Sequence, residues 1–312
     1  MSDILPIPHE PPYRLGIDLG GTKIECAILK GAAVIHRQRV ETPQGDYLAT
    51  LARIASLVRS AWSLTGYTLP VGIGIPGSVS PDHGRIKNAN SVCLIGQDLA
   101  GDLQGRLGQP VRLANDADCF ALSEATDGAG RGACTVFGAI LGTGCGAGIV
   151  VRGALLAGPN AIAGEWGHNP LPGYSAADGP PRRCYCGRFN CLETFLSGPG
   201  LSETHRQLTG ESLSARDMAS QHFNAPTTTG ADTLDAYTDH LARGLASVIN
   251  ILDPHVIVLG GGVSNIRPLY DDVPRRWAAY VFSDKVNTQL KPAIHGDSSG
   301  VRGAAWLWNG TT

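Results

Sequence analysis

Residues 15–29 read LGIDLGGTKIECAIL, and residues 137–151 read FGAILGTGCGAGIVV. Both stretches have the same layout: an apolar segment, a turn of glycine and threonine, and a second apolar segment. Apolar segments of this length next to glycines are typical of buried strands. The repetition of one layout indicates an internal duplication, with one strand–turn–strand copy in each half of the chain.

Strand and helix patterns alternate outward from each copy, which predicts an α/β fold. Strands are predicted at 15–19, 24–29, 33–41, 71–75, 110–115, 135–141, 148–151 and 255–262. Helices are predicted from an N-cap at Asp46 to a stop at Gly66, at 117–128, within 192–252 and above all at 233–252, at 269–280 and at 300–308. The glycine- and proline-rich stretch 159–191 is too long to be a simple connector.

Composition excludes several classes of protein. The chain has 312 residues, which suggests about two domains, and 25 basic against 27 acidic side chains give a net charge of −2. That balance predicts no binding of nucleic acid and none of an anionic membrane surface. The start, MSDILPIPHEPPYR, lacks the basic and long apolar parts of a signal peptide and predicts a short loose tail. We therefore expect a cytoplasmic protein whose five scattered cysteines are free thiols.

The two glycine-rich turns are candidate phosphate-binding sites. Backbone N–H groups that follow one another without a Cβ in the way form an anion nest. Two such hairpins facing each other across a cleft would hold the phosphates of a nucleotide from both sides, with hydroxyl groups from Thr22 and Thr143 as further donors. Asp18, at the end of the first strand, is placed to hold Mg²⁺ through water. The alternative is that both are ordinary hairpins that use glycine for positive φ.

Two other nucleotide-binding motifs are excluded. No GxxxxGK[ST] sequence is present, so the chain has no Walker-A loop. A GxGxxG pattern does occur at Gly72, Gly74 and Gly77, but Pro76 and turn-forming residues follow it. Dinucleotide binding by that motif requires the N-terminus of a helix at this point.

Asp116 is the candidate general base. It follows a predicted strand and opens a predicted helix, where a carboxylate can accept a proton from a substrate hydroxyl. Alone, the pattern equally fits an aspartate that only caps its helix.

The long loop contains a candidate metal site. Cys184, Cys186 and Cys191 cluster in it, and His168 precedes them. Three cysteines and a histidine form a closed, tetrahedral, structural zinc site, which would hold a loop without secondary structure in place. The alternative is three reduced thiols beside an unrelated histidine. Glu165 and His168 are close enough in sequence to approach one ligand, although Glu165 and Glu193 also fit an ordinary charged surface.

Taken together, these motifs resemble the ROK family of sugar kinases, within the actin/hexokinase-like ATPase fold. The resemblance runs from Leu15 to Trp308 and is strongest for the fructokinase/mannofructokinase branch. It rests on GIDLGGTK (16–23), GIPGSVSP (74–81), NANS (88–91), ANDAD (114–118), GTGCGAG (142–148), GEWGHNPLP (164–172), CYCGRFNCLET (184–194), VIVLGGG (256–262) and HGDSSGVRGAAWLW (295–308).

The resemblance implies a role for each matching residue. Asp116 is expected to be the catalytic base. The residues expected to bind the sugar are Gly77, Ser78, Asn90, Asn115, Glu165, His168 and Glu193. Those expected at the nucleotide and Mg²⁺ are Asp18, Gly20, Gly21, Thr22, Lys23, Thr143, Gly144, Gly261 and Gly262. His168, Cys184, Cys186 and Cys191 are expected to hold a structural Zn²⁺.

The resemblance also implies a two-lobed fold with a duplicated βαβ core. The N-terminal lobe is expected to comprise 1–117 and 296–312, closed by the last helix, and the C-terminal lobe 118–295. The sequence departs from the family at Asp118, where asparagine is usual, at Asn190, where glycine is usual, and in the long spacer between His168 and Cys184. Because asparagine tolerates the left-handed conformation, the turn at Asn190 is expected to survive.

The expected activity is ATP-dependent phosphorylation of a hexose, above all of D-fructose at its 6-hydroxyl and also of mannose. The alternatives are a glucokinase or N-acetylglucosamine kinase and, from another class, a non-catalytic sugar sensor. A homodimer is expected by analogy with the family alone.

Overall fold

The computed structural model describes residues 12–89, 91–220 and 230–309. The expected N-terminal tail falls largely on residues 1–11, outside the described part. The chain divides into two compact units, residues 1–119 with 300–312, and residues 120–299. The sequence places the boundaries after residues 117 and 295, slightly earlier than the structure does. Cys119 belongs to the first unit because it packs against Gly74 and Gly303.

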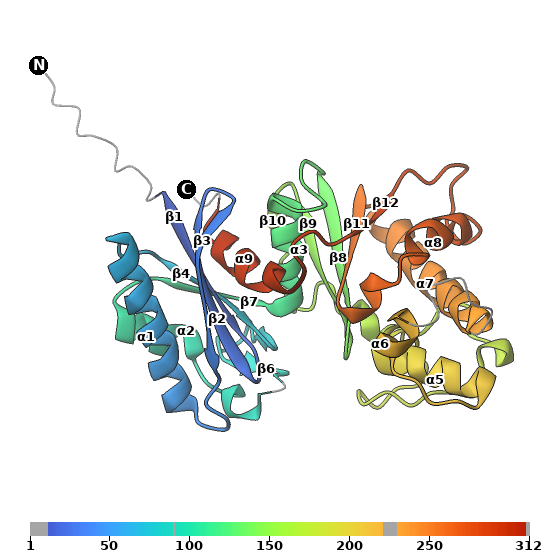
Figure 1. The fold of residues 1–312 in the computed structure, drawn as a ribbon, viewed down its shortest axis with the longest axis horizontal. Helices are drawn as coiled ribbons and strands as arrows, with labels where there is room; N and C mark the ends of the chain where they lie inside the picture. Colours follow the sequence, from blue (N-terminus) through green and yellow to red (C-terminus); the bar gives the residue numbers. More distant parts are fainter. Residues whose placement is uncertain (1–11, 90, 221–229, 310–312) are drawn as a thin grey trace, which may run out of the picture. The chain divides into compact units, whose positions relative to one another are not determined.

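The N-terminal unit is built on a five-stranded mixed sheet (Figure 1). Its strand order is β3-β2-β1-β4-β7. The strands are β1 (Tyr13–Leu19), β2 (Lys23–Lys30), β3 (Ala33–Glu41), β4 (Val71–Ile75) and β7 (Val111–Asn115). The first three pair antiparallel, whereas β1, β4 and β7 run parallel, so their carboxyl ends share one edge. A separate small hairpin pairs β5 (Ser78–Val79) with β6 (Ile86–Lys87).

Helices cover both faces of this sheet (Figure 1). On one face lie α1 (Tyr47–Thr65) and α2 (Leu99–Leu107), and on the other lies α9 (Ser299–Trp306). Asp46 caps α1 by accepting a hydrogen bond from the amide of Ala49, and Gly66 ends it in the left-handed conformation, as the sequence predicts. A short 3₁₀ turn, η1 (Val92–Leu94), precedes α2.

Three glycines bring α9 directly onto the backbone of its own unit. A Cβ added at Gly16 of β1 would lie 2.2 Å from the carbonyl oxygen of Val301, and one at Gly72 of β4 would lie 1.8 Å from that of Ala304. From the helix itself, a Cβ at Gly303 would lie 1.7 Å from the carbonyl oxygen of Cys119. Real side chains never approach so closely, so these positions accept only glycine in this packing.

The C-terminal unit repeats the same sheet (Figure 1). Its strand order is β10-β9-β8-β11-β12, again with antiparallel pairing on one side and parallel pairing on the other. The strands are β8 (Thr135–Leu141), β9 (Cys145–Val151), β10 (Ala154–Leu155), β11 (Val256–Gly260) and β12 (Gln289–Pro292). The matching topology confirms the duplication predicted from the two glycine-rich stretches.

The helices of this unit enclose its own core. Phe120, from α3 (Asp116–Thr126), packs on one face of the sheet against Gly138 and Gly260. On the other face lie α4 (Glu193–Leu196), α5 (Gly198–Thr209), α6 (Ala215–Met218), α7 (Ala231–Leu252) and α8 (Leu269–Trp277). Further 3₁₀ turns are η2 (Trp166–His168), η3 (Ala176–Asp178), η5 (Gly262–Asn265) and η6 (Gly296–Ser298).

The stretch 192–252, predicted as helical, is divided into several helices. Ser197 ends α4 and caps α5, where Pro199 occupies the first turn, and Gly210 ends α5 in the left-handed conformation. The sequence does not predict α2, whose Gly101 and Gly105 weaken the helix pattern, or the short edge strand β12, which ends in proline. No helix within the described part of the chain is both long and apolar enough to cross a membrane.

Candidate functional site

The first glycine-rich turn has its carbonyl groups bound from one side. The hydroxyl group of Thr42 donates to the carbonyl oxygen of Gly20 at 2.8 Å. The backbone amide of Thr42 donates to the carbonyl oxygen of Thr22 at 3.0 Å. The Gln44 side-chain amide donates to the carbonyl oxygen of Gly21. In a trans peptide the N–H points opposite to the C=O. The amides of Gly21 and Thr22 therefore point away from residues 42–44, as an anion nest requires.

Asp18 and Asp116 share one environment in the N-terminal unit. Burial, and to a smaller extent the Asp116 and Glu25 carboxylates, raise the pKa of Asp18 to about 6, against the opposing effect of Arg39. Gly300 leaves space for the Asp18 carboxylate, because a Cβ there would lie 3.0 Å from an Asp18 oxygen. The predicted Mg²⁺ residue and the predicted base thus interact electrostatically at the carboxyl ends of β1 and β7.

Asn115 holds two predicted site segments together. Its Nδ2 donates to the carbonyl oxygen of Gly77 at 3.0 Å, and its Oδ1 accepts from the amide of Ala117 at 2.8 Å. Gly77 has φ +147°, and a Cβ there would lie 2.8 Å from the carbonyl oxygen of Lys87. Asp116 also accepts from the amide of Ala117, at 2.8 Å. The side-chain amide of Asn115 therefore fixes the GIPGS turn beside the base.

The remaining predicted residues of this unit lie around the same sheet edge. Ser78 begins β5 and is half-buried, and Lys23 begins β2 and is exposed. Asn90, predicted to bind the sugar, lies outside the described residues.

In the C-terminal unit, the second glycine-rich turn is joined to Glu193. The carboxylate of Glu193 accepts a hydrogen bond from the amide of Cys145 at 3.0 Å, and a Cβ at Gly144 would lie 2.9 Å from it. The carbonyl oxygen of Gly142 accepts from the amide of Gly198 at 2.7 Å. A predicted sugar residue and a predicted phosphate turn are therefore in direct contact, a link that the sequence alone does not reveal.

The GEWGH segment packs directly on β9. A Cβ at Gly164 would lie 2.0 Å from the carbonyl oxygen of Ala147, and one at Gly167 would lie 1.9 Å from that of Cys145. Between them, Trp166 Nε1 donates to the carbonyl oxygen of Gly146 at 3.2 Å. The two glycines allow the GEWGH segment to contact the backbone of β9 closely, and the hydrogen bond from the indole of Trp166 fixes the position of the segment along that strand. As a result the exposed Glu165 and the half-buried His168 flank the same strand end.

The predicted metal ligands come together at one point. The side-chain ligand atoms of His168, Cys184, Cys186 and Cys191 all lie within 4.8 Å of one another. His168 Nδ1 lies 3.6 Å from Cys184 Sγ, and Cys186 Sγ lies 3.6 Å from Cys191 Sγ. Zinc bonds of about 2.0–2.3 Å in a tetrahedron give ligand separations of about 3.5–3.8 Å. This set therefore fits a closed Cys₃His zinc site.

The turn at Asn190 survives the departure from glycine. Asn190 has φ +57°, which confirms the predicted left-handed conformation. Its side-chain oxygen also accepts a hydrogen bond from the amide of Arg182 at 2.8 Å. The guanidinium of Arg182 is buried, stacks 4.3 Å from the Phe195 ring centroid, and donates to backbone carbonyls and to Thr204.

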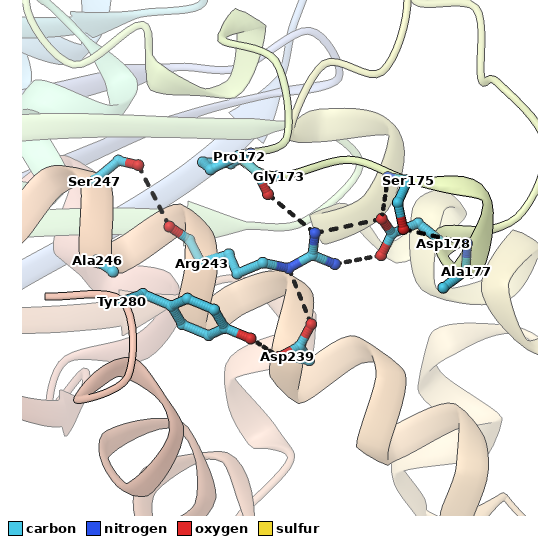
Figure 2. A pocket seen from close by; sticks show the side chains of 10 residues that line it. All are labelled: Pro172, Gly173, Ser175, Ala177, Asp178, Asp239, Arg243, Ala246, Ser247 and Tyr280. Atoms are coloured by element: carbon cyan, nitrogen blue, oxygen red, sulfur yellow. Dashed lines mark hydrogen bonds and ion pairs between the residues drawn. The ribbon is translucent and has the colours of Figure 1, made fainter.

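A second buried arginine fixes the loop to α7 (Figure 2). Arg243 pairs with Asp178 of η3 and with Asp239 at 2.9 Å, and donates to the carbonyl oxygen of Pro172 at 3.0 Å. Tyr280 donates to Asp239 at 2.6 Å. These residues line a hollow of about 430 Å³. Arg243 is held by two carboxylates and a backbone carbonyl of the protein, so the cluster anchors the loop, and the sequence gives no sign of these distant partners.

The last predicted nucleotide residues, Gly261 and Gly262, follow β11. Gly261 has φ +80° and approaches the end of β8, where a Cβ would lie 2.4 Å from the carbonyl oxygen of Leu141. Gly262 begins η5, and a Cβ there would meet no heavy atom within 4 Å. The backbone at Gly262 is thus open to a ligand.

Comparisons with known proteins cover almost the whole chain. The family model described as "ROK family" matches residues 14–311. N-acetyl-D-glucosamine kinases of Yersinia enterocolitica and Pectobacterium atrosepticum are each 39% identical over 297 residues, which is 94% of this chain and 98% and 97% of theirs. A ROK hexokinase from Thermus thermophilus has TM-score 0.81 at 29% identity, over 94% of this chain and 96% of that one. A ROK glucokinase from Streptomyces griseus, solved with glucose and AMPPNP, has TM-score 0.73 at 26% identity, over 95% and 98%.

Proposed function

The chain belongs to the ROK family, and we propose that it is a sugar kinase that transfers the γ-phosphoryl group of ATP to the 6-hydroxyl of a hexose or an N-acetylhexosamine. The observation that carries this proposal is the arrangement at the carboxyl ends of β1 and β7. There Asp116 opens a helix, Asp18 lies within its electrostatic reach, and a nest of backbone amides begins three residues after Asp18, at Gly21. Asp116 can take a proton, while the backbone amides can bind a charged phosphate and Asp18 can hold Mg²⁺.

N-acetylglucosamine is the sugar that we propose as substrate. The curated relatives reported above carry that name and align over nearly their full length. They favour this alternative over fructose, the substrate implied by the resemblance to the fructokinase/mannofructokinase branch. Because all hexoses share most of their hydroxyl groups, the motif residues themselves do not distinguish between these sugars.

Each group has a defined part in the proposed reaction. Asp116 accepts the proton of the 6-hydroxyl as the oxygen attacks, and Asn115 holds the neighbouring backbone in place. In phosphoryl transfer, positioning and neutralisation of charge supply most of the rate. Each glycine-rich turn would bind phosphate oxygens through its amides, and Asp18 would hold Mg²⁺, which neutralises charge on the phosphoryl oxygens when bound.

The C-terminal unit would supply further contacts to the sugar and a structural metal. Glu165 and Glu193 offer carboxylates to sugar hydroxyls. The four zinc ligands leave no open coordination position, so the metal would hold the loop rather than act on the substrate.

The decisive experiment is an ATP-coupled assay on N-acetylglucosamine, glucose, mannose and fructose, with the wild type and Asp116→Asn. We expect the highest kcat/KM for N-acetylglucosamine. We expect Asp116→Asn to lower kcat by about 10²–10⁴ while sugar binding stays roughly intact. Asp118→Asn is the matched control, because the same change two residues along the same helix should leave kcat nearly unaltered. Near-normal turnover by Asp116→Asn would refute the assignment of the base.

A further inference from the structure

Tyr185 is held at the tip of a tight turn between two of the predicted zinc ligands. The amide of Gly187 donates to the carbonyl oxygen of Cys184 at 3.0 Å, and the amide of Cys184 donates to that of Arg188 at 2.8 Å. Gly187 has φ +90°, which suits the end of such a turn. The direction of the Tyr185 side chain is therefore set by the backbone of the cysteine cluster.

The side chain combines high exposure with a specific polar contact. Tyr185 is 82% exposed, yet its hydroxyl oxygen lies 3.0 Å from Nε2 of His168. The two rings meet edge to face, with centroids 5.1 Å apart and planes at 85°. A tyrosine in this position offers a ligand both an apolar ring and a polar hydroxyl group.

The tautomer of His168 decides whether the Tyr185 hydroxyl group accepts or donates in their contact. Nδ1 of His168 faces Cys184 Sγ and belongs to the metal-binding set. A neutral imidazole that coordinates through Nδ1 carries its proton on Nε2. With a metal ion on Nδ1, Nε2 would donate to the Tyr185 oxygen, and the phenol would keep its own O–H proton for a third group. His168, expected to bind the sugar directly, thus has its remaining nitrogen already engaged by Tyr185.

The surroundings of Tyr185 match the proposed substrate site. Tyr185 lines a hollow of about 450 Å³ together with Glu193 and Thr143, which are predicted sugar and phosphate residues. The carboxylates of Glu193 and Glu165 lie close enough to act on the phenol electrostatically. All of these residues belong to the C-terminal unit.

We propose that Tyr185 contacts the sugar, and that its hydroxyl group, which accepts a hydrogen bond from His168, donates one to a hydroxyl or carbonyl oxygen of the substrate. This inference rests on the proposed sugar kinase function and adds to it a residue outside the motif positions expected to bind the sugar. Tyr185 then helps to determine how tightly the preferred sugar is held, without taking part in proton transfer.

The test compares wild type, Tyr185→Phe and Tyr67→Phe in steady-state assays and in calorimetric titrations with the four sugars. Tyr185→Phe keeps the ring and removes the donor. We expect it to raise the KM and Kd of the preferred sugar about tenfold, the effect of one lost hydrogen bond, with kcat within about twofold and the KM of ATP unaltered. Tyr67 is an exposed tyrosine of the other unit, so Tyr67→Phe should match the wild type.

The zinc content of each variant separates contact with the sugar from support of the loop. If Tyr185 contacts the sugar, Tyr185→Phe retains about one zinc per chain and the wild-type melting temperature. An unaltered sugar KM and Kd, or a loss of zinc that accounts for the weaker binding, would overturn the proposal. If the wild type binds a sugar without phosphorylating it, the kinase function fails and the Kd of Tyr185→Phe still decides the role of Tyr185. A wild type that binds none of the four sugars overturns both.

Discussion

At the scale of single residues, the close contact between Gly167 and β9 gives a direct test of the packing. A Cβ at Gly167 would lie 1.9 Å from a backbone carbonyl oxygen, which cannot move without disturbing the strand. We expect Gly167→Ala to lower the free energy of unfolding by about 1–3 kcal/mol or more, measured by urea denaturation.

Gly105 is the matched control for that substitution. It lies within α2, and a Cβ there would meet no heavy atom within 4 Å. Since alanine is the better helix former, Gly105→Ala should stabilise the protein by about 0.5–1 kcal/mol. Equal effects of the two substitutions would contradict the packing described for the GEWGH segment.

Residues whose role depends on local chemistry could be predicted from the sequence. Asp46, Gly66 and Asn190 act through their own backbone conformation or through neighbours in the chain, and each does what its residue type suggests. The pairing of Arg243 with Asp178 joins positions 65 residues apart, so no local pattern reports it. The hydrogen bond between Tyr185 and His168 escapes prediction for the same reason.

At the scale of elements, His240 makes the attachment of η3 to α7 sensitive to pH. His240 is buried and its Nε2 lies 3.1 Å from Asp178. Burial, with help from Arg243 and Arg182, lowers the pKa of His240 to about 4, against the opposing effect of Asp178. Below pH 6.5 the unfolded chain takes up a proton that the folded protein excludes until about pH 4. Stability is therefore complete above that window and is lost as the pH falls through it.

The expected contribution of His240 is about 3 kcal/mol between pH 6.5 and pH 4. His240→Gln keeps a donor for Asp178 but cannot gain a proton. Urea denaturation of the two proteins across this range should give a shallower pH dependence for the variant. Parallel curves would show that His240 does not titrate in this way.

Removal of the metal should affect one loop and spare the other unit. The segment from η2 to α4 contains little regular structure, so the Cys₃His cluster is expected to hold much of it. We expect a zinc chelator to speed amide hydrogen exchange across residues 164–196 and to leave β1, β2 and β4 unaltered. Purified protein that contains no zinc and exchanges slowly in this loop would contradict the proposed site.

At the scale of the whole molecule, each unit has a sheet and a hydrophobic core of its own. The duplication of the sheet could be predicted because both copies repeat one strand–turn–strand pattern. Elements that differ between the copies, such as α2 and the small β5–β6 hairpin, carry weak patterns that only tertiary packing stabilises. The unit boundaries depend on contacts of Cys119 and Gly300, which have no sequence signal of their own.

The point at which the chain leaves the C-terminal unit is fixed by one buried carboxylate. Glu124 of α3 accepts hydrogen bonds from the amides of Ile294 and His295, both at 3.2 Å, and from the Ser299 hydroxyl at 3.0 Å. Glu124→Gln cannot accept all of these bonds, because one oxygen becomes an NH₂ donor. We expect a loss of about 1–3 kcal/mol in the free energy of unfolding, measured by urea denaturation. A change below about 0.5 kcal/mol would show that this carboxylate is dispensable.

The glycine-lined contact of α9 with β1 and β4 has a consequence for biosynthesis. These two strands are translated before the C-terminal unit, whereas the helix that covers their sheet face is translated after it. Until α9 has been synthesised, the glycine-lined face of β1 and β4 lacks the helix backbone that packs on it in the folded unit. The first unit to be synthesised thus cannot complete its fold until the second has been translated, and during that interval the uncovered face of its sheet is a surface for a chaperone to shield.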